Sequence, residues 1–251
     1  MPEIVVFIAL LLGGAVHTTA GFGSALIAMP ILTLVLHPVV ATPLQTLVGL
    51  SLSATIFYQY RAHWPWPDAV PLVLFSILGI PLGTLAITTL PESVVLGALG
   101  VVLLLYAAFE TLSRTGPSTP STPGLRADPL YIGSSVAGFL SGVLGAAYAT
   151  NGPPAIIYGS WRRWPRGEFK SVLQSMFVVN GICILLWQGG QGLLTREVGW
   201  YALFAAPGLL IGALIGRRID KRLDSARFQL LITNMLFVLG IALILRAILA
   251  R

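Results

Sequence analysis

Residues 94–108 read VVLGALGVVLLLYAA, an uninterrupted apolar run that decides the fold class. A strand of a transmembrane barrel alternates apolar and polar residues over about ten positions, whereas this run is apolar on every face and predicts a helix. Similar runs follow one another along the chain: 56% of the 251 residues are hydrophobic and 10% are charged, against roughly 25% charged in soluble domains. We therefore expect an all-α polytopic membrane protein.

Apolar runs bounded by proline, glycine and charged residues divide the chain into ten expected helical segments. Two of them, 21–36 and 149–160, are too short to cross the hydrocarbon core comfortably, because a crossing takes about 20 residues. The ten expected segments are 4–20, 21–36, 43–60, 69–90, 92–112, 130–148, 149–160, 170–189, 198–216 and 226–249.

A polar stretch at residues 113–129, SRTGPSTPSTPGLRADP, predicts a linker, because it has no place in lipid. The flanking repeats, 1–112 and 130–251, show the same order of features. GFGSALIAMP at 21–30 corresponds to GAAYATNGPP at 145–154 with an offset of 124, and an offset of 129 aligns further pairs. Those pairs are Gln45 with Gln174, Thr46 with Ser175, Gly79 with Gly208 and Gly83 with Gly212. An internal duplication is expected, and five segments per repeat require the second repeat to be inverted.

The basic residues predict the orientation. With ten crossings, 12 of the 15 Lys and Arg residues fall on one side: Arg61, Arg114, Arg126, Arg162, Arg163, Arg166, Lys170, Arg217, Arg218, Lys221, Arg222 and Arg227. Because basic loops stay in the cytoplasm, both chain ends are expected outside it, in a cell inner membrane. If the two short segments were re-entrant, eight crossings would give a split of 9 to 6, which is less favoured.

Glycine, proline and small polar residues gather where the first segment meets the second and where the sixth meets the seventh. Such residues break a helix and free backbone groups, which is tolerated at membrane depth only beside protein or a water-filled cavity. Transporters built from inverted repeats place breaks of this kind near the midplane, where helix N-termini direct free N–H groups at an anion. The alternative is close helix packing through small residues, which we expect for the Gly79–Gly83 and Gly208–Gly212 pairs.

The predicted substrate-binding residues come from these two breaks and from a polar stripe on each third helix. The stripe would line the same cavity, although such side chains also serve only to bond neighbouring helices. The candidates are Thr19, Gly21, Gly23, Ser24, Gln45, Ser51, Tyr148, Thr150, Asn151, Gly152, Gln174 and Asn180.

Acidic residues are expected only at the ends of segments or in loops, which argues against a carboxylate proton relay, a metal cage or a cation carrier. His17 is the one ionisable residue near a break, so it is a candidate for proton coupling or else a buried, hydrogen-bonded histidine. Cys183 is the single cysteine, and no nucleotide-binding or hydrolytic motif is present. We expect neither an enzyme nor a cofactor nor a nucleic-acid partner.

The stretches TAGFGSALIAMP at 19–30 and GFLSGVLG at 138–145, continuing to Pro154, resemble the TauE/SafE family of sulfite exporters and related anion permeases. The resemblance covers nearly the whole chain. It implies export of sulfite, sulfoacetate or another sulfur-containing organic anion, and it places the two glycine motifs of the family on Gly21 with Gly23 and on 145–154. Ala146, Ala147 and Tyr148 stand where the family usually has further glycines.

The sequence therefore predicts a secondary transporter of a small sulfur-containing anion that works by alternating access at a midplane site. The expected partners are this anion and the lipid bilayer, and a homo-oligomer is left open. Two alternatives remain: an importer or exchanger of another small anion such as a carboxylate, and a membrane scaffold subunit that transports nothing.

Overall fold

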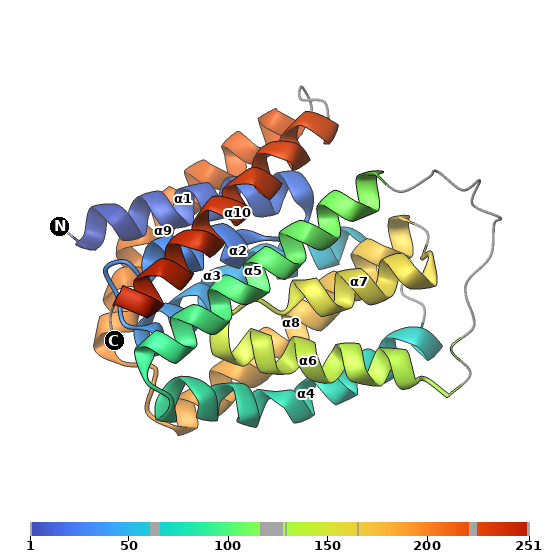
Figure 1. Ribbon diagram of the computed structural model, residues 1–251, viewed down its shortest axis with the longest axis horizontal. Helices are drawn as coiled ribbons and strands as arrows, with labels where there is room; N and C mark the ends of the chain where they lie inside the picture. Colours follow the sequence, from blue (N-terminus) through green and yellow to red (C-terminus); the bar gives the residue numbers. More distant parts are fainter. Residues whose placement is uncertain are drawn as a thin grey trace.

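The computed structural model describes residues 2–60, 66–115, 128, 130–164, 166–220 and 225–249, and within these residues it contains ten helices and no strand (Figure 1). Seven of the ten, namely α1, α3, α4, α5, α8, α9 and α10, are long and apolar enough to cross a membrane. The prediction of an all-α polytopic membrane protein is confirmed. The helices are α1 (Pro2–Ala20), α2 (Ser24–Leu32), α3 (Pro38–Tyr60), α4 (Trp66–Thr89), α5 (Glu92–Thr115), α6 (Ile132–Tyr148), α7 (Gly152–Arg162), α8 (Arg166–Gly190), α9 (Arg196–Asp220) and α10 (Ser225–Leu249). Residues 116–127 and 129 of the predicted linker lie outside the described residues.

Successive helices run in opposite directions along the long axis, so the two chain ends lie at the same end of the molecule (Figure 1). The packing of α5 on α10 shows this directly. A Cβ atom on Gly100 would lie 2.8 Å from the carbonyl oxygen of Gly240, while one on Gly97 would lie 3.3 Å from Ala247, further along α10. The two helices are therefore antiparallel. With eight crossings they would be parallel, so this packing favours ten alternating segments.

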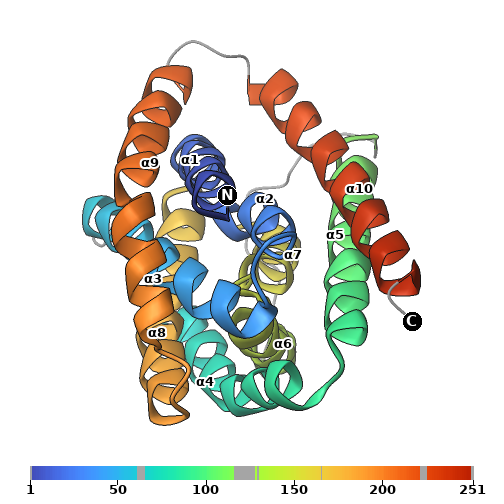
Figure 2. The same ribbon diagram turned by 90° about the vertical axis from the view of Figure 1, so that its left-hand side faces the viewer.

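Two parallel helix pairs, α1 with α9 and α4 with α6, join the first half of the chain to the second (Figure 2). Glycines let their backbones touch. A Cβ atom would lie 1.8 Å from the Ser76 carbonyl oxygen at Gly142 and 2.1 Å from the Leu11 carbonyl oxygen at Gly212. At Gly79 and Gly83 the distances to the nearest backbone oxygen would be 2.3 and 2.2 Å. The expectation that these glycines serve close packing is confirmed, and such contacts replace the hydrophobic effect between helices in lipid.

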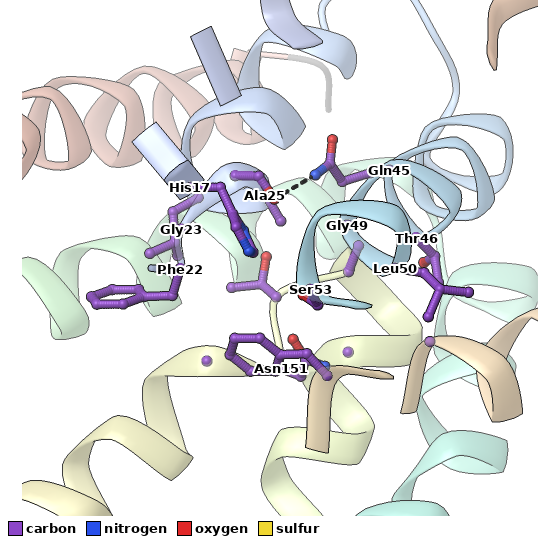
Figure 3. Close-up of a pocket in the computed structure, with 18 of the residues that line it drawn as sticks. His17, Phe22, Gly23, Ala25, Gln45, Thr46, Gly49, Leu50, Ser53 and Asn151 are labelled. Atoms are coloured by element: carbon purple, nitrogen blue, oxygen red, sulfur yellow. Dashed lines mark hydrogen bonds between the residues drawn. The ribbon is translucent and has the colours of Figure 1, made fainter. Parts of the chain in front are cut away.

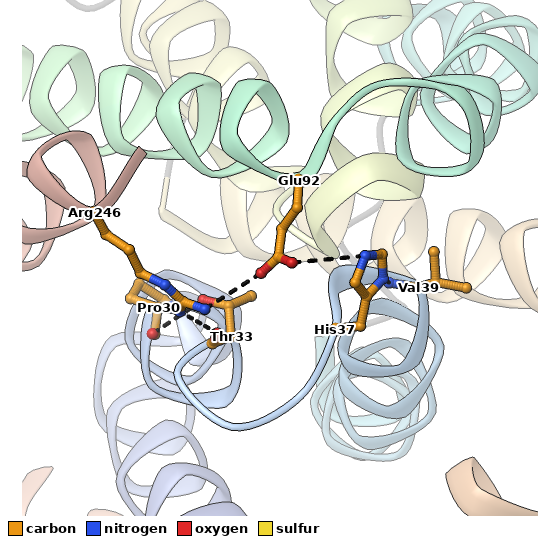
Figure 4. A network of polar contacts seen from close by, with 6 residues as sticks. All are labelled: Pro30, Thr33, His37, Val39, Glu92 and Arg246. Carbon is orange, nitrogen blue, oxygen red and sulfur yellow. Dashed lines mark hydrogen bonds and ion pairs between the residues drawn. The ribbon is translucent and has the colours of Figure 1, made fainter. Parts of the chain in front are cut away.

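The end of the molecule that holds the chain termini is tied together by a polar network (Figure 4). Arg246 in the last turn of α10 donates hydrogen bonds to the carbonyl oxygen of Thr33, after α2, and to Glu92 at the start of α5. The other carboxylate oxygen of Glu92 lies 3.8 Å from Nε2 of His37, before α3. One carboxylate and one guanidinium thus connect four helix ends at this face.

The glycine contacts predict a sharp difference between two Gly→Ala variants. Gly142→Ala places a methyl group inside the van der Waals radius of the Ser76 carbonyl oxygen, so α4 and α6 must separate, at a cost of about 1–3 kcal/mol. Gly199→Ala on α9 is the control, because a Cβ atom there meets nothing within 4 Å. Thermal unfolding of the detergent-solubilised protein should show a midpoint several degrees lower for Gly142→Ala and an unchanged or higher one for Gly199→Ala. Equal midpoints for the two variants would contradict the close packing.

Candidate functional site

The chain turns back between α1 and α2 through two glycines in the left-handed region. Gly21 has φ of 82° and Gly23 has φ of 94°, a conformation that costs other L-residues roughly 1–2 kcal/mol. The N–H of Gly21 donates to the carbonyl oxygen of His17 over 2.7 Å and closes α1. Gly23 is the residue before α2, and no side chain caps this helix start. The first amide groups of α2, from Ser24 onward, are therefore left without helical partners.

The second turn, between α6 and α7, uses different residues for the same purpose. Ala149 closes α6 with φ of 52°, and the N–H groups of Ala149 and Thr150 donate to the carbonyls of Gly145 and Leu144. Asn151 precedes α7, and its side chain makes no capping hydrogen bond. Prolines at 153 and 154 carry no N–H, so the open amides at this helix start are concentrated at Asn151 and Gly152.

Both turns face one buried cavity of about 50 Å³ (Figure 3). By the helical rise of 1.5 Å, α2 and α7 measure about 14 and 16 Å, which is about half of a hydrocarbon core. They reach the cavity from opposite ends of the molecule, so two helix N-termini meet there (Figure 1). The cavity has room for only a few waters, and none of the described residues that line it is acidic. Its polar lining and glycine residues are His17, Gly23, Ser24, Gln45, Thr46, Gly49, Ser53, Gly145, Thr150, Asn151, Gly152 and Gly181.

Three carbonyl groups at the turns accept hydrogen bonds from protein side chains. Thr42 Oγ1 donates to the Ala147 carbonyl over 2.9 Å, and Gln188 Nε2 donates to the Ala146 carbonyl over 3.0 Å. Gln174 donates to the Gly21 carbonyl. These three acceptors are thus occupied, Gln45 Oε1 has no partner among the described residues, and the donors at the starts of α2 and α7 have no side-chain cap. A cavity with surplus donors and no carboxylate favours an anion.

Two side chains add to the donors of this cavity. Gln45 Nε2 donates to Ser24 Oγ over 3.0 Å, so the hydroxyl hydrogen of Ser24 remains available for another acceptor. His17 is 3% exposed, and neither ring nitrogen has a partner among the described residues. Figure 3 shows its ring pointing from α1 into the cavity. An uncharged buried imidazole that lines a cavity can both donate and accept.

The structure brings seven of the thirteen candidates named from the sequence together around this cavity: His17, Gly23, Ser24, Gln45, Thr150, Asn151 and Gly152. Thr19, Gly21 and Ser51 line a second, larger cavity instead. Ser51 follows Gln45 by six residues, which places it about 120° around the helix. Residues 45, 49 and 53, spaced by four, form the lining face of α3, so helical spacing would have identified Gly49 and Ser53.

The other three candidates support the cavity from outside. Gln174 holds the Gly21 carbonyl, as described above. Asn180 Oδ1 accepts a hydrogen bond from Ser76 Oγ over 2.6 Å and so joins α8 to α4. Tyr148 is buried at the end of α6 and does not line the cavity. Among the described residues, no cluster of His, Cys, Asp and Glu could hold a metal ion.

The family model for sulfite exporter TauE/SafE matches residues 6–243 of the chain. The chain belongs to the TauE/SafE family. It is 26% identical over 244 residues to the probable sulfite/organosulfonate exporter TauE of Cupriavidus necator, an alignment that covers 95% of this chain and 93% of that protein. It is also 26% identical over 253 residues to the probable membrane transporter protein ORF9 of a Sinorhizobium species, covering 96% and 90% of the two chains. No solved structure matches the chain significantly.

The second break of this chain carries Ala149 in the left-handed conformation, with φ of 52°. We predict that Ala149→Gly raises the stability by about 1 kcal/mol, because glycine adopts this φ without strain. Ala147→Gly is the control. Ala147 is buried within α6, so its loss removes a packed methyl group and adds chain entropy. Thermal midpoints should move in opposite directions, and a loss of stability in both variants would contradict the turn geometry.

Proposed function

We propose that this protein is a secondary transporter that exports a small sulfur-containing anion, sulfite or an organosulfonate, by alternating access around the central cavity. The observation that carries the proposal is the meeting of two uncapped helix N-termini in a cavity without an acidic side chain. Membership of the TauE/SafE family and the name of the Cupriavidus relative support the choice of cargo.

In this proposal the oxygens of the anion accept hydrogen bonds from both halves of the molecule. The amide groups at the starts of α2 and α7 and the hydroxyl of Ser24 provide the donors, and the positive ends of both helix dipoles stabilise the charge. Asn151 adds a side-chain amide beside the second helix start. The cavity volume of about 50 Å³ suits a compact anionic group rather than a large solute.

We further propose that the chain consists of two inverted repeats, 1–112 and 130–251, joined by the linker 113–129, in a cell inner membrane. Arg162 and Arg163 at the end of α7 and Arg217 and Arg218 in the last turn of α9 lie at the end opposite the termini, which supports a cytoplasmic position for that end. Outward movement of net negative charge is then favoured by an inside-negative potential, by about 2.3 kcal/mol per charge at 100 mV, and a proton that moves with the anion cancels one charge.

Purified protein in liposomes should move sulfite, and Asn151→Leu should lower the rate by about 10- to 100-fold, because a hydrogen bond to a charged group is worth about 1.5–3 kcal/mol. Asn234→Leu on α10 is the matched control, since Asn234 is exposed and does not line the cavity. Size-exclusion profiles should stay unchanged in both variants. Normal flux in Asn151→Leu would refute the site. If the wild-type protein moves neither sulfite, organosulfonates nor carboxylates, the transport proposal is wrong.

We also propose that His17 takes up a proton together with the anion, because an imidazolium would add a positive charge to the cavity. Because the protonated fraction of His17 falls as the pH rises, transport should slow with rising pH over the range tested. The assay should use an organosulfonate whose charge is constant there, so that substrate titration does not contribute. His17→Gln should retain flux and lose the pH dependence, whereas His37→Gln, far from the cavity, should retain both. An unchanged pH profile in His17→Gln would contradict the coupling.

A further inference from the structure

A second cavity, of about 340 Å³, lies between α1, α3, α8 and α9 beside the first break. Its lining includes the polar residues Thr19, Ser51 and Thr55, the charged residues Lys170 and Arg217, and Gly21 of the break. Lys170 comes from the first turns of α8, and Arg217 from the last turn of α9. Both cations therefore stand at the end of the molecule opposite the chain termini (Figure 1).

Among the described residues that line this cavity, Lys170 and Arg217 carry charge and none is acidic. The hydroxyl groups in its wall already donate their hydrogens to backbone carbonyls. Thr19 donates to Ala15 and Gly216 over 2.8 and 3.1 Å. Ser51 donates to Val48 over 2.7 Å, and Thr55 donates to Ser51 over 3.0 Å. An anion in this cavity would thus be attracted by Lys170 and Arg217 rather than by the hydroxyls.

The first break separates this cavity from the central one. Gly21 lines the second cavity, and the next two residues, Phe22 and Gly23, line the central cavity. A Cβ atom on Gly21 would meet nothing within 4 Å, so the second cavity reaches the backbone of the break itself. On the other side, Gln174 holds the Gly21 carbonyl. Three residues of chain and one side-chain hydrogen bond thus lie between the two spaces.

We propose that the second cavity is an entry vestibule, in which Lys170 and Arg217 concentrate small sulfonate or sulfite anions before they pass the break at Gly21. This inference rests on the proposed anion transport. The vestibule is wide enough for a hydrated organic anion, whereas the central cavity is smaller and takes a compact anionic group. The two cations attract anions by long-range electrostatic interaction. They therefore raise the local anion concentration without discriminating between anions of the same charge.

The first test compares two double variants with the same loss of charge. Lys170→Gln with Arg217→Gln should raise the KM for sulfite applied from the basic face by about tenfold at low ionic strength, with an unchanged maximal rate. Arg163→Gln with Arg218→Gln is the control, because both side chains are exposed at the same end and neither lines the vestibule. The difference should shrink at high salt, where charges are screened within about 3 Å at 1 M. Equal KM values for the two double variants would overturn the proposal.

A second test does not depend on transport. In a Cys183→Ser background, Thr55→Cys places one thiol in the vestibule wall. The measured quantity is the rate of modification by an anionic methanethiosulfonate reagent divided by the rate for a cationic one. This ratio should fall about tenfold when Lys170 and Arg217 are replaced by glutamine. A ratio of rates that is the same with and without the two cations would overturn the vestibule. If the wild-type protein carries no anion but the labelling preference is present, the proposed transport fails while the electropositive vestibule stands.

Discussion

Every backbone polar group inside a membrane protein needs a partner, because the hydrocarbon core supplies none. The turns at residues 21–23 and 149–151 interrupt the helices within the bundle and release both carbonyl and amide groups. The carbonyl groups and the amide groups differ in their hydrogen-bond partners. Side chains of Thr42, Gln188 and Gln174 occupy the carbonyls, whereas the amides at the starts of α2 and α7 face a shared cavity. The preference for an anion follows from this division.

The sequence predicted the order of the helices and the positions of both breaks, because apolar length and glycine or proline punctuation are local properties. It also identified four of the glycines through which helices touch, Gly79, Gly83, Gly208 and Gly212, but not Gly142. It did not identify which helix face lines the cavity: Ser51 was grouped with Gln45, although 100° per residue places Ser51 elsewhere. Nor does sequence spacing show that Asn180 is bonded to Ser76 on α4, since that contact depends on how two distant helices pack.

The two halves are similar in backbone arrangement but not in charge. The offset of 129 residues that aligns the third and fourth helices of the halves places Ala41 opposite Lys170 and Thr88 opposite Arg217. The first half therefore has no cations at the positions equivalent to Lys170 and Arg217. If the repeats are inverted as proposed, this difference in sequence becomes a difference between the two faces of the membrane. The proposed vestibule would then give the transporter a preferred side of anion entry.

The two faces of the molecule also differ in their hydrogen bonds. Thr42 on α3 is bonded to the Ala147 carbonyl of the second break, while Ser171, its counterpart on α8, is buried with no partner among the described residues. At the face of the chain termini, Arg246 joins the end of α2 to Glu92 (Figure 4). Beside the basic cavity, Gln174 donates to the Gly21 carbonyl and Thr19 donates to the Gly216 carbonyl over 3.1 Å. In the proposed alternating access, opening the face of the chain termini would require the Arg246 and Thr42 bonds to break.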